Sequence, residues 1–188
     1  MTDQDHDQGH DQGHDQGHDQ GHDQGHGREE KGRTPRLATG FADADRSAGL
    51  LLWQVTNRWQ AAQRAALKPY DLTHVQFVLL ASLTWLQADG PVTQRNLADH
   101  AATDPMMTSQ VLRVLETRGL VVREPHPHDR RARALAATPD GRALANRAIV
   151  AVEACDADFF GALGEDVPAF ATALLRLRNA ADPGLRDT

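Results

Sequence analysis

The sequence predicts a mainly α-helical fold with one small β-hairpin. Aromatic residues make up only 5% of the 188-residue chain, while alanine, leucine and arginine are abundant, which favours helix over sheet. Serine, threonine and aspartate recur just before apolar runs with helical periodicity, where they act as helix caps. Two short segments, residues 120–124 and 133–137, have the alternating side chains and the flanking glycine and proline residues that are typical of a β-hairpin.

Residues 1–40 are predicted to form a disordered tail. Residues 1–26 contain one DQDH unit and five DQGH units with Met1 as the sole apolar residue, so they cannot offset the entropy of ordering. The six histidines could bind Zn, Ni or Cu, but we favour a solvated repeat without a specific ligand. Removing the seven aspartates of this repeat from the 26 acidic residues leaves 19 against 20 basic ones, so the rest of the chain is nearly neutral.

Two helices are expected at the start of the folded part, residues 41–188. The first covers residues 48–67 and ends before Pro69, which restricts the residue preceding it. Thr73 and Gln76 form a capping box that opens the second helix, which ends at Asp89-Gly90-Pro91. The apolar positions of this second helix are Val75, Val78, Leu79 and Leu83.

Two further helices follow in close succession. Thr93 is expected to cap a short helix that carries Leu97 and Ala98 inward. Asp104 and Pro105 then provide a cap and a first-turn proline for a fourth helix that ends at Gly119. The core positions expected on this fourth helix are Val111, Val114 and Leu115. Two short helices joined by a tight turn are typical of a helix-turn-helix.

The predicted hairpin has a long basic tip. Pro125 and Pro127 lie between its strands, where a missing N–H costs no ladder hydrogen bond. The segment from residue 119 to residue 141 carries four arginines, namely Arg123, Arg130, Arg131 and Arg133. Such a concentration of fixed positive charge in an otherwise neutral chain indicates an anionic partner.

The chain is predicted to end in two amphipathic helices. Thr138 and Pro139 open a long one, with an apolar stripe of Leu144, Ala148, Val152, Cys155, Phe159 and Leu163. The last, residues 167–179, presents Phe170, Leu174 and Leu177. Together with the first helix, these exceed what a small helix-turn-helix core can cover, so we expect a homodimer. The alternative is that their apolar faces are buried within one monomer.

A helix-turn-helix followed by a basic hairpin is suited to binding duplex DNA. The second helix of the pair fits the major groove, and an arginine-rich hairpin beside it reaches the phosphates and the neighbouring minor groove. The same segments resemble the MarR family of winged-helix transcriptional regulators. In HDRRARALAATPDGRAL, Asp129 and Arg131 fit the Asp-x-Arg pattern of the family's hairpin, called the wing, and Thr138 and Gly141 fit its closing positions. The helix-turn-helix and the following VLRVLETRGLVVRE extend the resemblance over residues 47–179.

The resemblance implies a winged helix-turn-helix with terminal dimerisation helices. Residues 72–138 would read DNA, while residues 48–67 and 139–180 would form the dimer. The implied function is sequence-specific regulation of transcription at a pseudo-palindromic operator, as a repressor released by a small aromatic or phenolic ligand.

The resemblance also implies roles for individual residues. Arg131 would enter the minor groove at the wing tip, held by a bidentate pair with Asp129, the alternative being a surface ion pair of little consequence. Arg130 and Arg133 would contact phosphates. The residues expected to face DNA elsewhere are Arg95, Met107, Ser109, Gln110 and Arg113. Family members often have arginine where Gln110 stands, which leaves the base preference open.

Aromatic residues on the first two helices are expected at a ligand pocket. The resemblance implies a pocket between the dimer helices and the DNA-reading part, and a stacking surface with a polar group suits an aromatic ligand. The residues expected to line it are Trp53, His74, Phe77 and Trp85, with Trp59 nearby. The alternative is that each belongs to the core or to the dimer interface.

Several classes of protein are disfavoured by the sequence. The single cysteine, Cys155, excludes an intrachain disulfide and paired-cysteine metal fingers, and its apolar surroundings predict a raised pKa that argues against redox sensing. No segment has the length of a membrane span or the pattern of a signal peptide, so we expect a soluble, cytoplasmic protein without membrane partners. His100, His126 and His128 lie near acidic residues, but no motif indicates catalysis, a metal centre or a cofactor. A metal-responsive regulator that uses the tail and a protein-binding winged helix stay open as alternatives.

Overall fold

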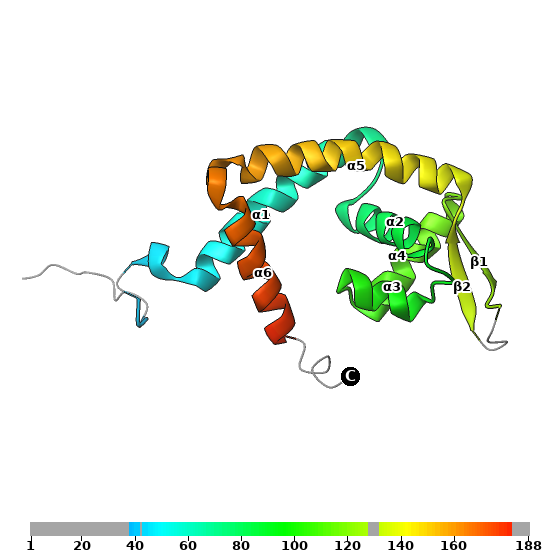
Figure 1. Ribbon diagram of the computed structural model, residues 1–188, viewed down its shortest axis with the longest axis horizontal. Helices are drawn as coiled ribbons and strands as arrows, with labels where there is room; N and C mark the ends of the chain where they lie inside the picture. The colour runs from blue at the N-terminus through cyan, green and yellow to red at the C-terminus, as the bar shows by residue number, and fades with distance from the viewer. Residues whose placement is uncertain (1–37, 42, 128–131, 182–188) are drawn as a thin grey trace, which may run out of the picture. The chain divides into compact units, whose positions relative to one another are not determined.

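A computed structural model describes residues 38–41, 43–127 and 132–181 (Figure 1). The chain divides into two units, residues 1–40 and 41–188, and the helices and strands belong to the second. In chain order they are η1 (Ala44–Arg46), α1 (Ala48–Leu67), η2 (Lys68–Tyr70), α2 (His74–Leu86), α3 (Gln94–Ala101), α4 (Pro105–Thr117), β1 (Val121–Pro125), β2 (Arg133–Ala137), α5 (Pro139–Phe160), η3 (Gly161–Asp166) and α6 (Val167–Ala181). The predicted fold class, mainly α with one small hairpin, is confirmed.

Side-chain caps start the helices where the sequence predicts them. In the capping box of α2, the Thr73 hydroxyl accepts from the Gln76 amide at 3.3 Å, and the Gln76 side chain accepts from the Thr73 amide at 3.0 Å. The Asp104 carboxylate accepts from the amides of Met106 and Met107 at 2.8 and 2.9 Å, and Pro105 occupies the first turn of α4. These bonds satisfy N–H groups that have no partner within the helix.

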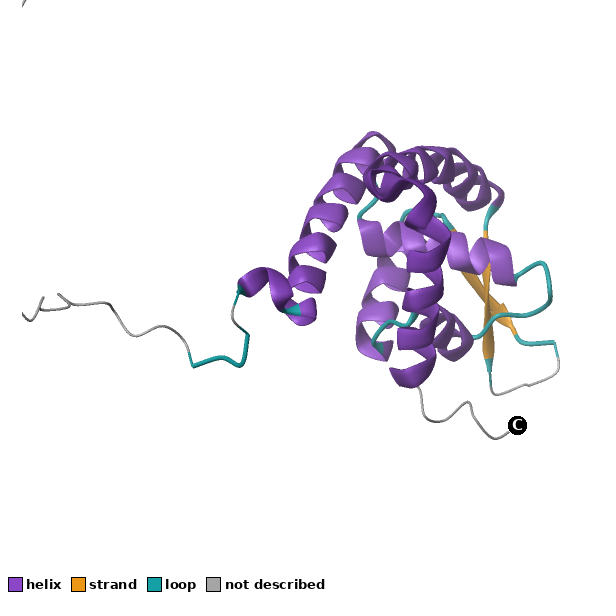
Figure 2. Ribbon diagram, turned by 60° about the vertical axis from the view of Figure 1, so that its left-hand side comes forward, coloured by secondary structure: helices purple, strands orange, loops and turns teal. Residues whose placement is uncertain are grey.

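Strands β1 and β2 pair antiparallel, and Figure 2 shows them beside the helices. Arg123 lies opposite Leu135, and the Leu135 amide also donates to the carbonyl of Val92, just before α3, at 2.7 Å. This bond attaches the hairpin to the helix-turn-helix. The first strand starts one residue later than predicted, because the Leu120 amide donates to the carbonyl of Leu115 at 2.9 Å. It also ends one residue later, so Pro125, which was predicted to lie between the strands, belongs to β1 and lies opposite Arg133.

Helix α2 runs through the centre of the core and contacts α1, α3, α4, α5 and β2. Its buried leucines pack with others that α3, α4 and the hairpin contribute, so one apolar cluster joins the helix-turn-helix to α5. The fully buried side chains of this cluster include Leu79, Leu80, Leu83, Leu97, Leu112 and Leu115. The packing holds α3, α4 and the hairpin in fixed positions relative to one another.

Two details of the predicted apolar pattern are wrong. On α4 the buried residues are Thr108, Leu112 and Leu115, which share one helical face because they are four and three positions apart. Val114, predicted to be a core residue, lies off this face and is 44% exposed. Leu163 does not continue the stripe of α5, since α5 ends at Phe160 and Leu163 belongs to the 3-10 turn η3. None of the helices in the described ranges is long and apolar enough to cross a membrane.

Candidate nucleic-acid interface

Helix α4 presents a continuous exposed face to solvent. The face is opposite the buried stripe and consists of Met106, Met107, Gln110, Arg113, Val114 and Thr117. Gln110 lies at its centre, with Met106 one turn before it and Val114 one turn after it. Ser109, also predicted to face DNA, is half-buried at the edge of this face. Methionine, amide and guanidinium groups are therefore all available on one side of the helix.

Hydrogen bonds hold the start of α4 to the turn that follows α3. The Thr103 and Thr108 hydroxyls are 2.8 Å apart, and the Thr108 hydroxyl also donates to the Asp104 carbonyl at 2.8 Å. Thr108 is fully buried, so these bonds satisfy a polar group that would otherwise be costly in the core. Ala102 has the left-handed conformation, with φ of 49°, and ends α3 at the turn between the two helices.

Arg123 of β1 connects the hairpin to both helices of the helix-turn-helix. Its Nε donates to the carboxylate of Glu116 near the end of α4, and its Nη1 and Nη2 each lie 3.4 Å from Oε1 of Gln94 on α3. The Gln94 amide nitrogen in turn donates to the carbonyl of Pro105 at 3.5 Å. One guanidinium group thus links three elements, and its ion pair with Glu116 removes it from the charges available to phosphate.

Three of the remaining residues predicted to contact DNA are exposed in the structure, and three others are not described. Arg133, the first residue of β2, is exposed, and so are Arg113 on α4 and Arg95 on α3. Arg95 lies 3.9 Å from Asp99 in an exposed ion pair that contributes little stability and can be exchanged for a phosphate. Asp129, Arg130 and Arg131 lie outside the described residues.

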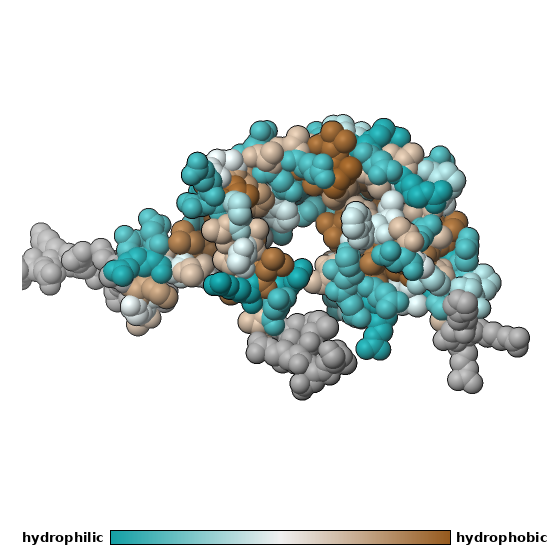
Figure 3. All heavy atoms as spheres, in the orientation of Figure 1, coloured by the Kyte–Doolittle hydropathy of each residue, from teal (hydrophilic) through white to brown (hydrophobic). Residues whose placement is uncertain are grey.

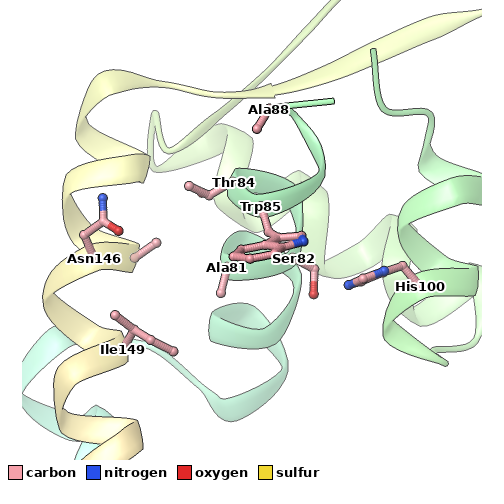
Figure 4. A pocket seen from close by; sticks show the side chains of 9 residues that line it. Ala81, Ser82, Thr84, Trp85, Ala88, His100, Asn146 and Ile149 are labelled. Atoms are coloured by element: carbon pink, nitrogen blue, oxygen red, sulfur yellow. The ribbon is translucent and has the colours of Figure 1, made fainter. Parts of the chain in front are cut away.

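A cavity of about 410 Å³ lies between α2, α3 and α5. Figure 4 shows the Trp85 indole projecting from α2 between Ile149 and Asn146 of α5 on one side and His100 of α3 on the other. The remaining lining residues are small: Ala81, Ser82, Thr84, Ala88 and Ala145. The cavity is mainly apolar, with a few polar groups from Ser82, Thr84, His100 and Asn146.

The four predicted pocket residues do not come together in this cavity. Trp85 lines it and is itself 74% exposed, whereas Trp53 lies exposed on α1 outside the cavity and Phe77 is buried in the core. His74 is half-buried and packs edge to face with Trp59, with ring centroids 5.0 Å apart. Burial lowers the pKa of His74, an effect that Asp156 opposes and Arg64 reinforces. Sequence periodicity could not separate these environments, because they depend on how α1, α2 and α5 cross.

A polar cluster joins α1 to α5 next to His74. The indole N–H of Trp59 and the side-chain amide of Gln63 both donate to Oδ1 of Asp156, at 2.7 and 2.6 Å. Gln63 is fully buried, and its Oε1 has no partner among the described residues. The cluster could not be found from sequence patterns, since Asp156 is 97 positions from Trp59 and 93 from Gln63.

Cys155 lies half-buried on α5 beside a shallow depression lined by Ala62, Ala66 and Phe159. Burial raises the pKa of its thiol, and the neighbouring Asp156 and Asp158 raise it further, as the sequence predicts. A thiol that stays protonated is a poor nucleophile. Within the described ranges, no three histidine, cysteine, aspartate or glutamate side chains are grouped to hold a metal ion.

Apolar side chains on α1 and α6 are left uncovered in the single chain. Trp53 is 68% exposed and Leu177 is 62% exposed. The other exposed apolar residues of these helices are Leu50, Leu51, Leu52, Val55, Val167, Leu174 and Leu175. Figure 3 shows hydrophobic residues, in brown, reaching the surface over α1, α5 and α6. Exposed apolar side chains gathered on particular helices are typical of a site of protein association.

Comparison with known proteins identifies regulators of transcription. An uncharacterized HTH-type transcriptional regulator of Bacillus subtilis, YdcH, is 43% identical to this chain over 123 residues, which are 65% of this chain and 84% of YdcH. The HTH-type transcriptional repressor Rv2887 of Mycobacterium tuberculosis is 39% identical over 118 residues, 63% of this chain and 82% of the repressor. CouR from Rhodococcus jostii, in a crystal structure bound to p-coumaroyl-CoA, superposes with a TM-score of 0.62 and 31% identity, covering 79% of this chain and 98% of CouR.

The family follows from the match of motif, fold and sequence together. A family model described as MarR family matches residues 72–132, which include α2, α3, α4 and β1. The relatives are similar over most of their own length, and the solved structure superposes on most of this chain. The chain belongs to the MarR family of winged-helix, DNA-binding transcriptional regulators.

Proposed function

We propose that this protein is a dimeric repressor that binds a pseudo-palindromic duplex and is released by a small aromatic ligand. The observation that supports DNA reading best is the exposed face of α4, which the ion pair between Arg123 and Glu116 holds beside the hairpin. A helix of this exposure and length fits the major groove, and two copies related by a two-fold axis would read two half-sites about one helical turn apart.

The wing supplies the second part of the proposed contact. Arg131, oriented by Asp129, enters the minor groove, while Arg130 and Arg133 contact phosphates. On the helix-turn-helix, Gln110 hydrogen bonds with adenine, Arg113 contacts guanine or phosphate, and Met107, Ser109 and Arg95 complete the surface. This distribution combines base reading by α4 with positioning contacts on either side.

Dimerisation accounts for the uncovered apolar faces of α1 and α6. Leaving Leu52, Trp53 and Leu177 in water is unfavourable by about 25 cal/mol for each Å² of apolar area, and an isologous interface would bury them in pairs. A dimer also doubles the number of phosphate contacts, which one half-site would supply too sparsely for tight binding.

The cavity beside Trp85 supports ligand control. It lies between α5 and the helix-turn-helix, so a bound ring would alter the distance between them and hence the spacing of the two α4 helices. Trp85 offers a stacking surface, and Ser82, His100 and Asn146 offer hydrogen bonds. CouR, a relative with the same fold, binds an aromatic acyl-CoA. We assign Trp85 to this ligand site, whereas Trp53, His74 and Phe77 lie outside the cavity.

The similarity to a named transcriptional repressor supports repression rather than activation. The experiment is selection of duplexes from a random pool at low and high salt. Enrichment of a two-fold symmetric sequence, with affinity that falls steeply as salt increases, is the expected result. A pool that stays random at both salt concentrations would rule out sequence-specific binding.

A further inference from the structure

The exposed face of α4 is richer in apolar side chains than in positive charge. Met106 is 71% exposed in the first turn of the helix. Met107 and Val114 are also exposed, and Arg113 is the single cationic side chain of this face. A helix that bound DNA through charge alone would not place apolar side chains at these positions.

The first turn of α4 is prepared to meet base edges rather than phosphates. The Asp104 carboxylate already accepts from the amides of Met106 and Met107, so these N–H groups are not available to a phosphate. The carboxylate also repels phosphate from this end of the helix. What the helix offers here is the side chain of Met106, one turn before Gln110 on the same face.

The major groove contains one apolar group, the C5-methyl group of thymine. Glutamine recognises the major-groove edge of adenine through two hydrogen bonds. An unbranched, flexible methionine one turn from Gln110 can reach a methyl group next to that adenine and exclude water from it. The chemistry of the two side chains is therefore complementary to consecutive A·T base pairs.

We propose that Met106 is a specificity-determining residue that reads the C5-methyl group of thymine beside the base pair bound by Gln110. The inference rests on the proposed DNA-reading function and deepens it by naming the bases. It predicts that each half-site contains a thymine whose methyl group contributes to affinity through Met106.

The test uses the duplex selected from a random pool and replaces its thymines one at a time by deoxyuridine, which removes the methyl group alone. With the unaltered full-length protein, replacement at one position of each half-site is expected to lower affinity about fourfold for each methyl group removed. Met106→Ala and Met106→Gln are expected to bind the thymine and deoxyuridine duplexes equally. Val150→Ala, which truncates an exposed apolar side chain on α5, should keep the full preference for thymine.

The outcomes separate this inference from the function on which it rests. If no sequence is selected, the proposed function fails, and the inference with it. If a sequence is selected but every deoxyuridine duplex binds as tightly as its parent, the function stands and the role of Met106 is refuted. The role is also refuted if Met106→Ala and Met106→Gln remain as sensitive to removal of the methyl group as the unaltered protein.

Discussion

Arg123 of β1 is ion-paired with Glu116 of α4, so the strand that leads into the wing is attached to the recognition helix by a charge-assisted hydrogen bond. The two side chains are partly exposed, at 32% for Arg123 and 28% for Glu116. A pair of this kind positions the wing relative to α4, and it leaves Arg123 unable to serve as an ordinary phosphate contact.

Arg123→Ala is therefore expected to weaken DNA binding by about 1–2 kcal/mol, roughly 5–30-fold, without changing the salt dependence of binding. Glu116→Gln should have a similar effect, and Arg123→Glu combined with Glu116→Arg should recover part of the affinity. The measurement is a binding titration on the selected duplex at four salt concentrations. A shallower salt dependence for Arg123→Ala would show that this arginine contacts phosphate.

Arg131→Ala and Arg113→Ala are expected to behave differently from the Arg123 variant. Each should lower the affinity and reduce the slope of log K against log salt by about 0.9 for every phosphate that the variant no longer neutralises. Arg147→Ala, at an exposed arginine of α5, provides a matched control that should leave both quantities unchanged. Folded Arg131 and Arg113 variants that bind as the unaltered protein does, at every salt concentration, would contradict the DNA-reading proposal.

The uncovered faces of α1 and α6 lead to a prediction about assembly. Leu52→Glu and Leu177→Glu should each raise the dissociation constant of the dimer at least about tenfold, because burying a leucine contributes about 1.5–3 kcal/mol and a buried carboxylate opposes association. Sedimentation equilibrium at several protein concentrations measures this change. Met106→Gln on α4 should leave the dimer intact. If the unaltered protein is monomeric at all concentrations, the dimer proposal is wrong.

Gly141 is predicted to contribute strongly to the stability of the fold. A Cβ atom at this position would lie 2.0 Å from the carbonyl oxygen of Leu120, which also accepts from the Thr138 amide at 3.0 Å. Neither backbone can move without breaking the junction between the wing and α5. We expect Gly141→Ala to reduce the free energy of unfolding by about 3 kcal/mol or more, measured with urea. Gly161→Ala, where nothing lies within 4 Å, should change it by less than about 1 kcal/mol.

The lowered pKa of His74 makes the stability of the protein depend on pH. Because the folded state holds the neutral imidazole, the unfolded chain binds a proton first as pH falls below the ordinary pKa of 6.5. The contribution of this group to the free energy of unfolding is therefore fully present above pH 6.5. It declines as the pH falls towards and through the lowered pKa. Urea unfolding between about pH 7.5 and pH 5 should show that His74→Gln flattens this decline. An unchanged pH profile in His74→Gln would assign the decline to other groups.

Sequence alone determined the parts of the fold that depend on near neighbours. Thr73 with Gln76, and Asp104 with Pro105, start their helices through hydrogen bonds that span two or three residues, so the helix boundaries could be read directly. The wing pattern at Asp129 and Arg131 likewise needed only local spacing to indicate the family, although the positions of these two side chains are not described.

Tertiary packing decided the parts that depend on how elements cross. The partners of Arg123, the burial of Leu112 instead of Val114, and the exposure of Met106 follow from the angles at which α3, α4 and the hairpin meet around α2. The same is true of the cavity at Trp85, to which α2, α3 and α5 all contribute. Hydrogen bonds and caps act over one helical turn, whereas these contacts join residues tens of positions apart, so only the assembled core brings them together.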